Sequence, residues 1–525
     1  MIPWQIQVNP MGSLPLSALV AALPVVYLFW AFGIKRLPGH TAGFGVLLIA
    51  MLVAVLGYRM PFKLATLSGF YGMAFGLFPV CWIVLNALFV YSLAHETGHM
   101  ETIRRSIASL TADSAIQALL IAFSFGAFLE GAAGFGAPVA ITAAMMVALG
   151  FAPQRAAVLC LTANTAPVAF GALGVPILVT AQVAGLPPEA VGRAVGSTLP
   201  VLSVMVPFYI VALLSGFGGV CRVWPWLTLG GVSFAMTQWA SARFLGPHLP
   251  DILAALASLF VVGTLLWIRS LKANPTTTDK PTPKQALLAF SPFLLLSLFV
   301  ALWGMPPFKA VLDQTLDIKL AIPWLDGAVI RDTKPLPAVF ELNVLSAAGT
   351  ALFLVGILSC AIFGISFKRA VQAYFKTFKA LLFPILTIAS FLGFAYVANF
   401  SGISLTLGVA LARTGSMFVQ LSPFLGWLGV FLTGSDTSSG ALFGMLQRSA
   451  AEQIGVDPLV LTAANAAGGV AGKMISPSSL AIACASVGLI GKEGEIFLKT
   501  IGHSLLFASL IAAIVTLQAY GLWFL

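Results

Sequence analysis

Two Gly-rich motifs far apart in the chain repeat one pattern, and each lies beside an ionisable residue inside apolar sequence. The first begins at Gly126 and reads Gly-Ala-Phe-Leu-Glu-Gly. The second begins at Gly429, 303 positions later, and reads Gly-Val-Phe-Leu-Thr-Gly. Three later pairs keep an offset of 301 positions: Asn164 and Asn465, Gly171 and Gly472, and Pro176 and Pro477. Repeated Gly-rich breaks in apolar segments are typical of the binding site of a membrane transporter.

The composition restricts the chain to the membrane class. Hydrophobic residues make up 59% of the 525 residues, charged residues make up 8%, and the mean hydropathy is +1.00. Soluble domains carry about 25% charged residues, and none could bury this much apolar surface. Met1 to Gln7 lack the positive charge that opens a cleaved signal peptide, so segment 14–33 is predicted to be a retained first span.

The charge and cysteine patterns argue against nucleic-acid binding and against a metal centre. The net charge of +10 comes mostly from Lys and Arg in short loops between apolar segments, as the positive-inside rule expects. The cysteines are scattered, so neither structural disulfides nor a cysteine-based zinc site is predicted. They are Cys81, Cys160, Cys221, Cys360 and Cys484. We predict no cofactor.

The apolar segments predict an all-α polytopic membrane protein with about 12 transmembrane helices, since a span takes roughly 17–25 residues. The predicted spans are 14–34, 41–57, 69–94, 155–182, 192–216, 222–241, 251–268, 286–304, 344–364, 381–400, 458–489 and 501–523. Segments 114–149 and 421–452 are interrupted by the Gly-rich motifs, and we predict that both are re-entrant hairpins. Non-helical backbone at membrane depth must be covered by protein or face a water-filled cavity.

The basic residues orient these segments. Segments 269–285 and 365–380 are rich in Lys and Arg and are predicted to be cytoplasmic, whereas the mixed-charge segment 305–342 is predicted to lie outside. The first hairpin then opens from the cytoplasm and the second from the outside, so the two copies form inverted repeats. We divide the chain into a first half, 1–268, the linker 269–285, and a second half, 286–525.

Two acids and one base lie at membrane depth, where a charge costs roughly 2.5–3.5 kcal/mol. They are Glu130 before the first break, Asp436 within the second break, and Lys473 in the repeat of segment 170–176. Burial favours the neutral form of a carboxyl group, so Glu130 and Asp436 are candidates for carrying a proton. A structural carboxylate is the alternative for Glu130. Lys473 either contacts a substrate carboxylate or forms an ion pair with one of the two acids.

Small polar residues and glycines at the breaks are the candidate substrate contacts, because the starts of broken helices favour anions. The alternative is that Ser435 and Asp436 only cap the second half-helix. The candidate substrate-binding residues are Gly131, Gly134, Gly136, Asn164, Thr165, Thr433, Ser435, Thr437, Ser438, Ser439, Asn465, Lys473 and Ser476. We expect the helices in segments 155–182 and 458–489 to unwind at Asn164–Pro167 and Asn465–Gly468, because Pro removes a helix hydrogen bond and Gly lowers helix propensity.

His95 to His99 match the H-E-x-x-H pattern, in which two histidines on one helix face bind zinc and Glu96 acts as a base. The match lies at the end of an apolar segment, Gly98 weakens a helix there, and a third ligand is not evident. We interpret these residues as interfacial, and no metal site is predicted. The chain also lacks a P-loop and a G-x-S-x-G motif.

Four stretches resemble the bacterial L-lactate permease family: Phe125–Ala144, Asn164–Gly171, Ser422–Ser439 and Gly472–Pro477. The resemblance implies transport of lactate, and often glycolate, in symport with protons across the bacterial cytoplasmic membrane. It also implies the elevator-type architecture of related carriers, with opposed hairpins and a moving transport domain, and such carriers are often homodimers. Family members often have Ser-Ser-Asn where this chain has Ser438-Ser439-Gly440, which leaves the exact 2-hydroxy acid open.

We favour a proton-coupled symporter that imports L-lactate, and with it D-lactate and glycolate. The substrate carboxylate would lie between the two hairpin tips, with Lys473 supplying positive charge and Glu130 and Asp436 carrying the proton. One alternative is a Na⁺-coupled carrier in which Asp436 and hairpin carbonyls ligate the ion. The others are an anion channel and an intramembrane enzyme built on His95, Glu96 and His99. The predicted partners are small 2-hydroxy monocarboxylates, protons and the lipid bilayer.

Overall fold

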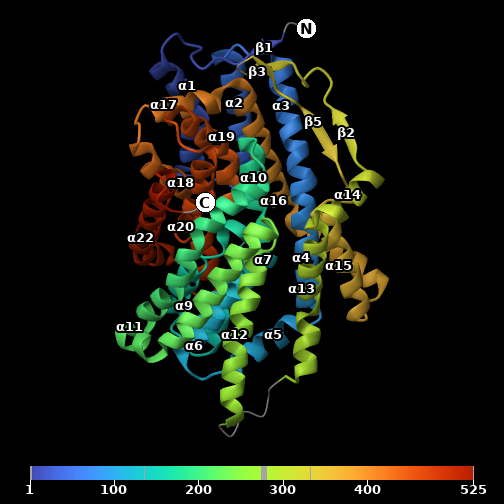
Figure 1. Cartoon of the computed structure of the whole chain (residues 1–525), viewed down its shortest axis with the longest axis vertical. Helices are drawn as coiled ribbons and strands as arrows, with labels where there is room; N and C mark the ends of the chain where they lie inside the picture. The colour runs from blue at the N-terminus through green and yellow to red at the C-terminus, as the bar shows by residue number, and fades with distance from the viewer. Residues whose placement is uncertain (1–2, 135, 273–280, 332, 524–525) are drawn as a thin grey trace.

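The computed structural model describes residues 3–134, 136–272, 281–331 and 333–523, and it is predominantly helical (Figure 1). Within those residues, nine helices are long and apolar enough to cross a membrane, or ten if the bent pair Pro153–Ala163 and Val168–Ala184 counts as one span. The prediction of about 12 spans is therefore not matched in number. One reason is that a single 57-residue helical element contains two of the predicted spans.

The first part of the chain forms two helical segments in the upper part of the view and one longer helical element that extends down the molecule (Figure 1). Its elements are α1 (Leu14–Leu28), η1 (Phe29–Ile34), α2 (Gly39–Leu52), η2 (Val53–Gly57), α3 (Phe62–Phe75), η3 (Gly76–Cys81), α4 (Trp82–Glu96) and α5 (His99–Ala108). Together α3, η3 and α4 form one 35-residue apolar element, Phe62–Glu96. The short helix α5 lies at the lower end of the view in Figure 1.

The first predicted hairpin corresponds to two helical arms, which we call hairpin 1. The first arm consists of α6 (Ser114–Ala118), η4 (Leu119–Phe125) and α7 (Gly126–Ala132), and the second arm is α8 (Ala137–Ala148). The second arm packs back on both η4 and α7. By length and composition alone, the first arm is also one of the nine candidate spans.

The segment after hairpin 1 is a helix broken in the middle. It consists of α9 (Pro153–Ala163), η5 (Val168–Phe170) and α10 (Gly171–Ala184), and the two halves are bent by 67°. The chain leaves α9 at Asn164, and the nominal first turn of α10 is also irregular, with positive φ angles at Ala172, Leu173 and Gly174. The unwound stretch therefore extends further than Asn164–Pro167.

The middle of the chain contains three long helical elements: α11 (Pro188–Phe244), α12 (Pro250–Lys272) and α13 (Pro283–Gly304). The long element α11 doubles back at Gly216, where the backbone has φ +68° and ψ −173°. Ser203 on its first arm donates a 2.8 Å hydrogen bond to Gln238 on its second arm. The predicted linker 269–285 is therefore shorter than expected, because α12 continues to Lys272. Its central residues, 273–280, lie outside the described part of the chain.

Five short strands correct the all-α prediction. They are β1 (Trp4–Gln5), β2 (Ile318–Ala321), β3 (Val329–Arg331), β4 (Lys334–Pro335) and β5 (Val339–Leu342). Strand β3 lies between β1, in parallel register, and β4, while β2 pairs antiparallel with β5 so that Ile318 faces Leu342. Four of the strands and α14 (Pro306–Thr315) occupy the predicted outer loop 305–342, because its β-branched and apolar residues find partners across the loop.

The last part of the chain repeats the arrangement of hairpin and broken helix. Its elements are α15 (Ala348–Ile362), α16 (Phe367–Ser401), α17 (Ile403–Ala412), α18 (Met417–Thr433), α19 (Asp436–Ile454), α20 (Pro458–Lys473), α21 (Pro477–Ser486) and α22 (Glu493–Ala519). We call the pair α18–α19 hairpin 2. The predicted cytoplasmic loop 365–380 is instead the beginning of α16, since this basic segment contains no Gly or Pro before Pro384 inside the helix.

The second broken helix does not unwind where we expected. Asn465–Gly468 lies inside the continuous helix α20, and the break falls at residues 474–476, between α20 and α21. The glycines serve a different purpose: a Cβ added at Gly468 would lie 1.9 Å from the carbonyl oxygen of Pro423, and one at Gly472 would lie 2.2 Å from that of Trp427. These glycines therefore let α20 touch the backbone of α18.

Candidate functional site

The two hairpins are broken at glycines whose backbone conformation other residues rarely adopt. Gly134 and Gly136 in hairpin 1 have φ of +61° and +85°, and Gly434 in hairpin 2 has φ +71°. Glycine adopts these left-handed conformations without a steric cost, so each motif can stop one helix and start the next within a few residues. The polar side chains that the sequence singled out lie near these breaks: Glu130 is close to the end of α7, and Ser435 and Asp436 are at the start of α19.

The two breaks and the two broken helices enclose a cavity of about 170 Å³. Hairpin 1 and the segment after it contribute Glu130, Gly134, Gly136, Val168, Gly171, Ala172 and Pro176; hairpin 2, α20 and α21 contribute Gly434, Ser435, Asp436, Thr437, Lys473, Ser478, Ser479 and Ile482. The lining thus combines two acids, one base and several hydroxyls with a few apolar side chains. We call it the central cavity.

Glu130 is buried at the hairpin 1 side of the central cavity. Asn164, at the end of α9, donates a 3.0 Å hydrogen bond from Nδ2 to Oε2 of Glu130. The other oxygen, Oε1, lies 2.8 Å from the position that a Cβ on Gly171 would occupy, so this carboxyl group lies directly against the backbone of residue 171. The unwound start of α10 thereby holds Glu130 in place.

Asp436 is buried at the hairpin 2 side and is less well satisfied. In the described structure, neither carboxyl oxygen of Asp436 has a hydrogen-bond partner. Its Oδ1 lies 2.2 Å from the position of a Cβ on Gly469, so the carboxyl group lies directly against α20. Leaving a buried acceptor unsatisfied costs roughly 1–3 kcal/mol, and more if it is charged. Such a group is suited to binding a proton or a ligand.

Lys473 ends α20 beside both acids. Its Nζ donates a 2.8 Å hydrogen bond to the carbonyl oxygen of Gly434 at the tip of hairpin 2. The ammonium attracts Glu130 and Asp436 electrostatically, yet none of the ion pairs between described residues joins Lys473 to an acid. The ion pair that we considered for Lys473 is therefore not formed in this conformation.

The hydroxyls of hairpin 2 bond mainly to the backbone around the break. Ser435 is the N-cap of α19, and its side chain accepts a hydrogen bond from the backbone N–H of Ser438 at 3.3 Å. Thr433 donates to the carbonyl oxygens of Gly429 and Ser435, at 2.8 and 3.0 Å. Ser476 caps α21 in the same way. Two of the helix starts at the cavity, α19 and α21, thus combine a serine cap with the positive end of the helix dipole.

The predicted substrate-binding residues divide into two groups. Five of them line the central cavity: Gly134, Gly136, Ser435, Thr437 and Lys473. The others lie outside its lining: Gly131, Asn164, Thr165, Thr433, Ser438, Ser439, Asn465 and Ser476. In this second group Ser439 donates to the Gly426 carbonyl oxygen and receives a 3.4 Å hydrogen bond from Asn465, whereas Thr165 donates to the carbonyl oxygen of Thr162.

Eight lining residues were missed by the sequence interpretation. Gly171 and Pro176 belong to the repeat pairs, and Ser478 and Ser479 directly follow the paired Pro477, so the repeat itself carried a signal for them. Gly434 was quoted in the motif but not assigned a role. Ala172, Val168 and Ile482 are apolar residues in apolar segments, and no sequence signal separates them from ordinary packing residues.

A third buried acid, Asp251, was also missed. Its Oδ1 accepts a 3.1 Å hydrogen bond from Gln238, and its Oδ2 has no partner among the described residues. Gln238 also donates to the carbonyl oxygen of Ala166 in the unwound stretch, at 3.2 Å. Gly131, next to Glu130, packs on Asp251: a Cβ there would lie 2.9 Å from the Asp251 Cβ. An acid at the first turn of an apolar helix is typical of a helix start, which hid this residue.

The link before α12 contains His248, whose Nδ1 lies 2.9 Å from the carbonyl oxygen of Leu173 in the irregular start of α10. Burial lowers the pKa of His248, so the neutral imidazole is favoured there. This link thus braces the unwound segment beside the central cavity.

The His95–His99 match does not form a helical zinc site. The helix α4 ends at Glu96, and Gly98 adopts φ +76° before α5 begins, so the two histidines do not share one helix face. Glu96 forms a 2.6 Å ion pair with Lys376, and the ring of His99 stacks on Phe363 with centroids 3.9 Å apart. The two side chains join α4 and α5 to the region around the start of α16.

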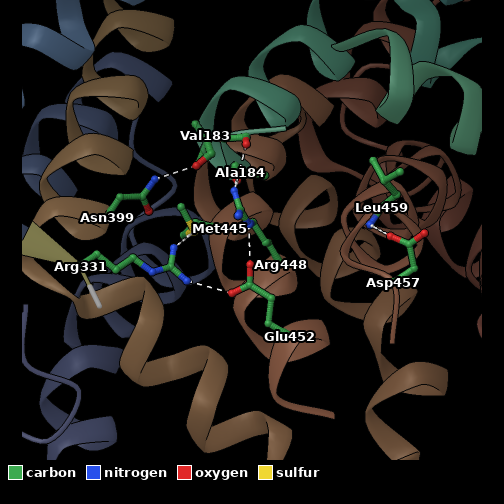
Figure 2. Close-up of polar contacts among 10 residues, drawn as sticks. Val183, Ala184, Arg331, Asn399, Met445, Arg448, Glu452, Asp457 and Leu459 are labelled. Carbon is green, nitrogen blue, oxygen red and sulfur yellow. Dashed lines mark hydrogen bonds and ion pairs between the residues drawn. The ribbon is translucent and has the colours of Figure 1, made fainter. Parts of the chain in front are cut away.

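Figure 2 shows how the end of α10 is held at the strand-bearing end of the molecule. Arg448 of α19 donates to the carbonyl oxygens of Ala184 and Gly185, at 2.6 and 2.9 Å. Glu452 pairs with both Arg448 and Arg331 of β3, at 2.8 and 2.9 Å. Arg331, Arg448 and Glu452 also line a second cavity of about 910 Å³.

These features define a multi-pass helical membrane protein with a small polar site enclosed by two broken hairpins. The family model described as L-lactate permease matches residues 17–522. The chain therefore belongs to the L-lactate permease family, a family of transporters, and is a multi-pass protein of a bacterial inner membrane.

Individual relatives match along nearly their full lengths. The glycolate permease GlcA of Escherichia coli K12 is 47% identical over 552 residues, covering 99% of both chains. The L-lactate permease of Bacillus subtilis 168 is 46% identical over 543 residues, covering 97% of this chain and 96% of that protein. Among solved structures, Neisseria gonorrhoeae MtrF, described with a class of antimetabolite efflux pumps, covers 89% of this chain and 84% of its own, with 15% identity and a TM-score of 0.45.

Proposed function

We propose that this protein imports small 2-hydroxy monocarboxylates, namely L-lactate, D-lactate and glycolate, in symport with protons. The observation that carries the proposal is the central cavity, where two acids and one base meet the capped starts of α19 and α21. The names of its relatives, which are permeases for L-lactate and for glycolate, support the substrate class.

The charges at the cavity support coupling of one proton to each monocarboxylate. A substrate anion and the Lys473 ammonium sum to zero when Glu130 and Asp436 are both protonated. After the substrate leaves, Lys473 is balanced if one of the two acids gives up its proton. Each state is then neutral as it passes through low dielectric, where an uncompensated charge is costly. The loaded and empty states differ by one anion and one proton.

The arrangement of elements supports inverted repeats and an elevator-type movement. Phe62–Glu96 and Phe367–Ser401 are both 35 residues long and are offset by 305 positions at each end. The helices α5 and α17 are both 10 residues long and lie at opposite ends of the molecule in Figure 1. We propose that hairpin 1 and hairpin 2 are re-entrant, that they move together with the broken helices against α16 and its neighbours, and that the protein is a homodimer.

The test is uptake of radiolabelled L-lactate and glycolate by proteoliposomes containing the purified protein. Proton and sodium gradients are imposed separately, and empty liposomes serve as the control. Accumulation driven by the inward proton gradient alone is expected. Accumulation driven by sodium alone would overturn proton coupling and favour a cation bound near the unpartnered oxygens of Asp436. Uncoupled flux that does not saturate would favour a channel.

A further inference from the structure

Ile482 closes the hairpin 1 side of the central cavity. Its Cδ1 lies 2.4 Å from the position that a Cβ on Gly136 would occupy, so the side chain lies directly on the backbone of the hairpin 1 break. Ser478 and Ser479, one turn earlier on α21, share its helix face, since residues three and four apart are neighbours on a helix. All three side chains line the cavity, and α21 therefore presents hydroxyls at one end of it and a branched apolar group at the other.

The cavity consequently has a polar pole and an apolar pole. At the polar pole, Lys473 bonds to the carbonyl oxygen of Gly434, and Ser478 Oγ lies 2.0 Å from the position of a Cβ on Gly434. At the other pole, which we call the apolar pole, Ile482 lies on Gly136, and the Cβ of Ala172 lies 3.1 Å from the position of a Cβ on Gly134. The Oε1 of Glu130 lies 3.6 Å from that same position, so this carboxyl group, which is neutral when it carries the coupled proton, borders the two apolar side chains. A ligand with a carboxylate at one end and a small alkyl group at the other matches this distribution.

The volume limits how large the alkyl group can be. The central cavity of about 170 Å³ is well below the roughly 300–1,000 Å³ of sites for drug-sized ligands. Both hairpin breaks are tightly covered, since α21 places Ser478 against Gly434 and Ile482 against Gly136. The space beside the hairpin 1 break is therefore set by the side chain of residue 482.

We propose that Ile482 sets the upper size limit of the substrate by contacting the group attached to carbon 2 of the 2-hydroxy acid. In glycolate this group is a hydrogen atom, and in lactate it is a methyl group. The carboxylate lies at the polar pole beside Lys473, and the methyl group lies against Ile482 and Ala172. This inference rests on the proposed function, because it assumes that the central cavity binds such acids.

The test compares kcat/KM for glycolate, L-lactate and 2-hydroxybutyrate in proteoliposomes. Ile482→Ala is expected to raise the ratio for 2-hydroxybutyrate over lactate by about tenfold, since one methylene group changes discrimination by roughly that factor or more. Ile482→Phe is expected to lower the ratio for lactate over glycolate by about the same factor. The matched control is Leu480→Ala, because Leu480 is buried on the same helix but does not line the cavity.

The outcomes separate this inference from the proposed function. If the wild-type protein takes up none of the three acids, the proposed function fails and the inference fails with it. If the wild-type protein takes them up but Ile482→Ala and the milder Ile482→Val both keep the wild-type ratios, only the inference is overturned. A ratio that shifts equally in Leu480→Ala would also overturn it, because loosening α21 would then explain the change.

Discussion

The contact between α18 and α20 predicts that Gly468→Ala damages both stability and transport. A Cβ at residue 468 would lie 1.9 Å from the carbonyl oxygen of Pro423 and 2.6 Å from its carbonyl carbon. Ordinary contacts of a Cβ begin at about 3.4 Å, so the helices must move apart by roughly 1.5 Å. Because the obstructing atoms belong to the backbone, no change of side-chain rotamer relieves the clash.

Overpacking of this kind costs about 1–3 kcal/mol of stability. The displacement also reaches the central cavity, because Lys473 lies five residues further along the same helix. A misplacement of about 1 Å at a functional group is able to reduce a rate by up to roughly 100-fold. We therefore expect a lower melting temperature together with a loss of uptake that substrate concentration does not fully restore.

The assay is thermal denaturation of the purified protein in detergent, followed by lactate uptake in proteoliposomes. Gly502→Ala is the matched control, because Gly502 lies within α22 and a Cβ there has no atom within 4 Å. This control is expected to keep its activity and to be stabilised by up to about 1 kcal/mol through helix propensity. A Gly468→Ala protein that melts and transports like the wild type would refute the reasoning.

Three further substitutions test other contacts. Lys473→Met is expected to raise the KM for lactate by at least about tenfold, because it removes the only basic side chain among the described residues that line the cavity; an unchanged KM would place the carboxylate elsewhere. Asp251→Asn keeps an acceptor for Gln238 and removes an acid that forms no ion pair with a described residue, so the melting temperature at pH 8 should not fall; a clear fall would mean that the ionised carboxylate is stabilising. Glu452→Gln should change stability by less than about 1 kcal/mol, because its pairs with two arginines are partly exposed; a larger loss on melting would show that the pairs act as a network.

The sequence predicted the breaks at the two hairpins well, for a physical reason. Gly134, Gly136 and Gly434 adopt backbone conformations that favour glycine. The acids and hydroxyls around them cost free energy at membrane depth, so their presence in an apolar segment indicates a functional site. Local composition is therefore sufficient to find Glu130 and Asp436. Local composition does not show that the Glu130 carboxyl group accepts a hydrogen bond from Asn164, whereas the Asp436 carboxyl group has no partner among the described residues.

Glycines in helices were less informative, because glycine has two opposite uses. Gly468 suggested unwinding, but it and Gly472 permit close approach of two continuous helices. The difference depends on the partner helix α18, which lies against α20 in space but is not part of its local sequence. The same limit explains α16, whose basic first part suggested a loop, and Asp251, whose position at the end of a predicted span did not suggest a buried acid.

Proton coupling through Glu130 is the central claim, and comparing exchange with accumulation in Glu130→Gln tests it most directly. Glutamine keeps the shape of the protonated acid and an amide oxygen that can accept the hydrogen bond from Asn164, so substrate binding should survive. We predict that this variant still exchanges lactate across the membrane at equal pH but no longer accumulates lactate when an inward proton gradient is imposed. Accumulation at the wild-type level under that gradient would contradict the account and leave Glu130 with a structural role.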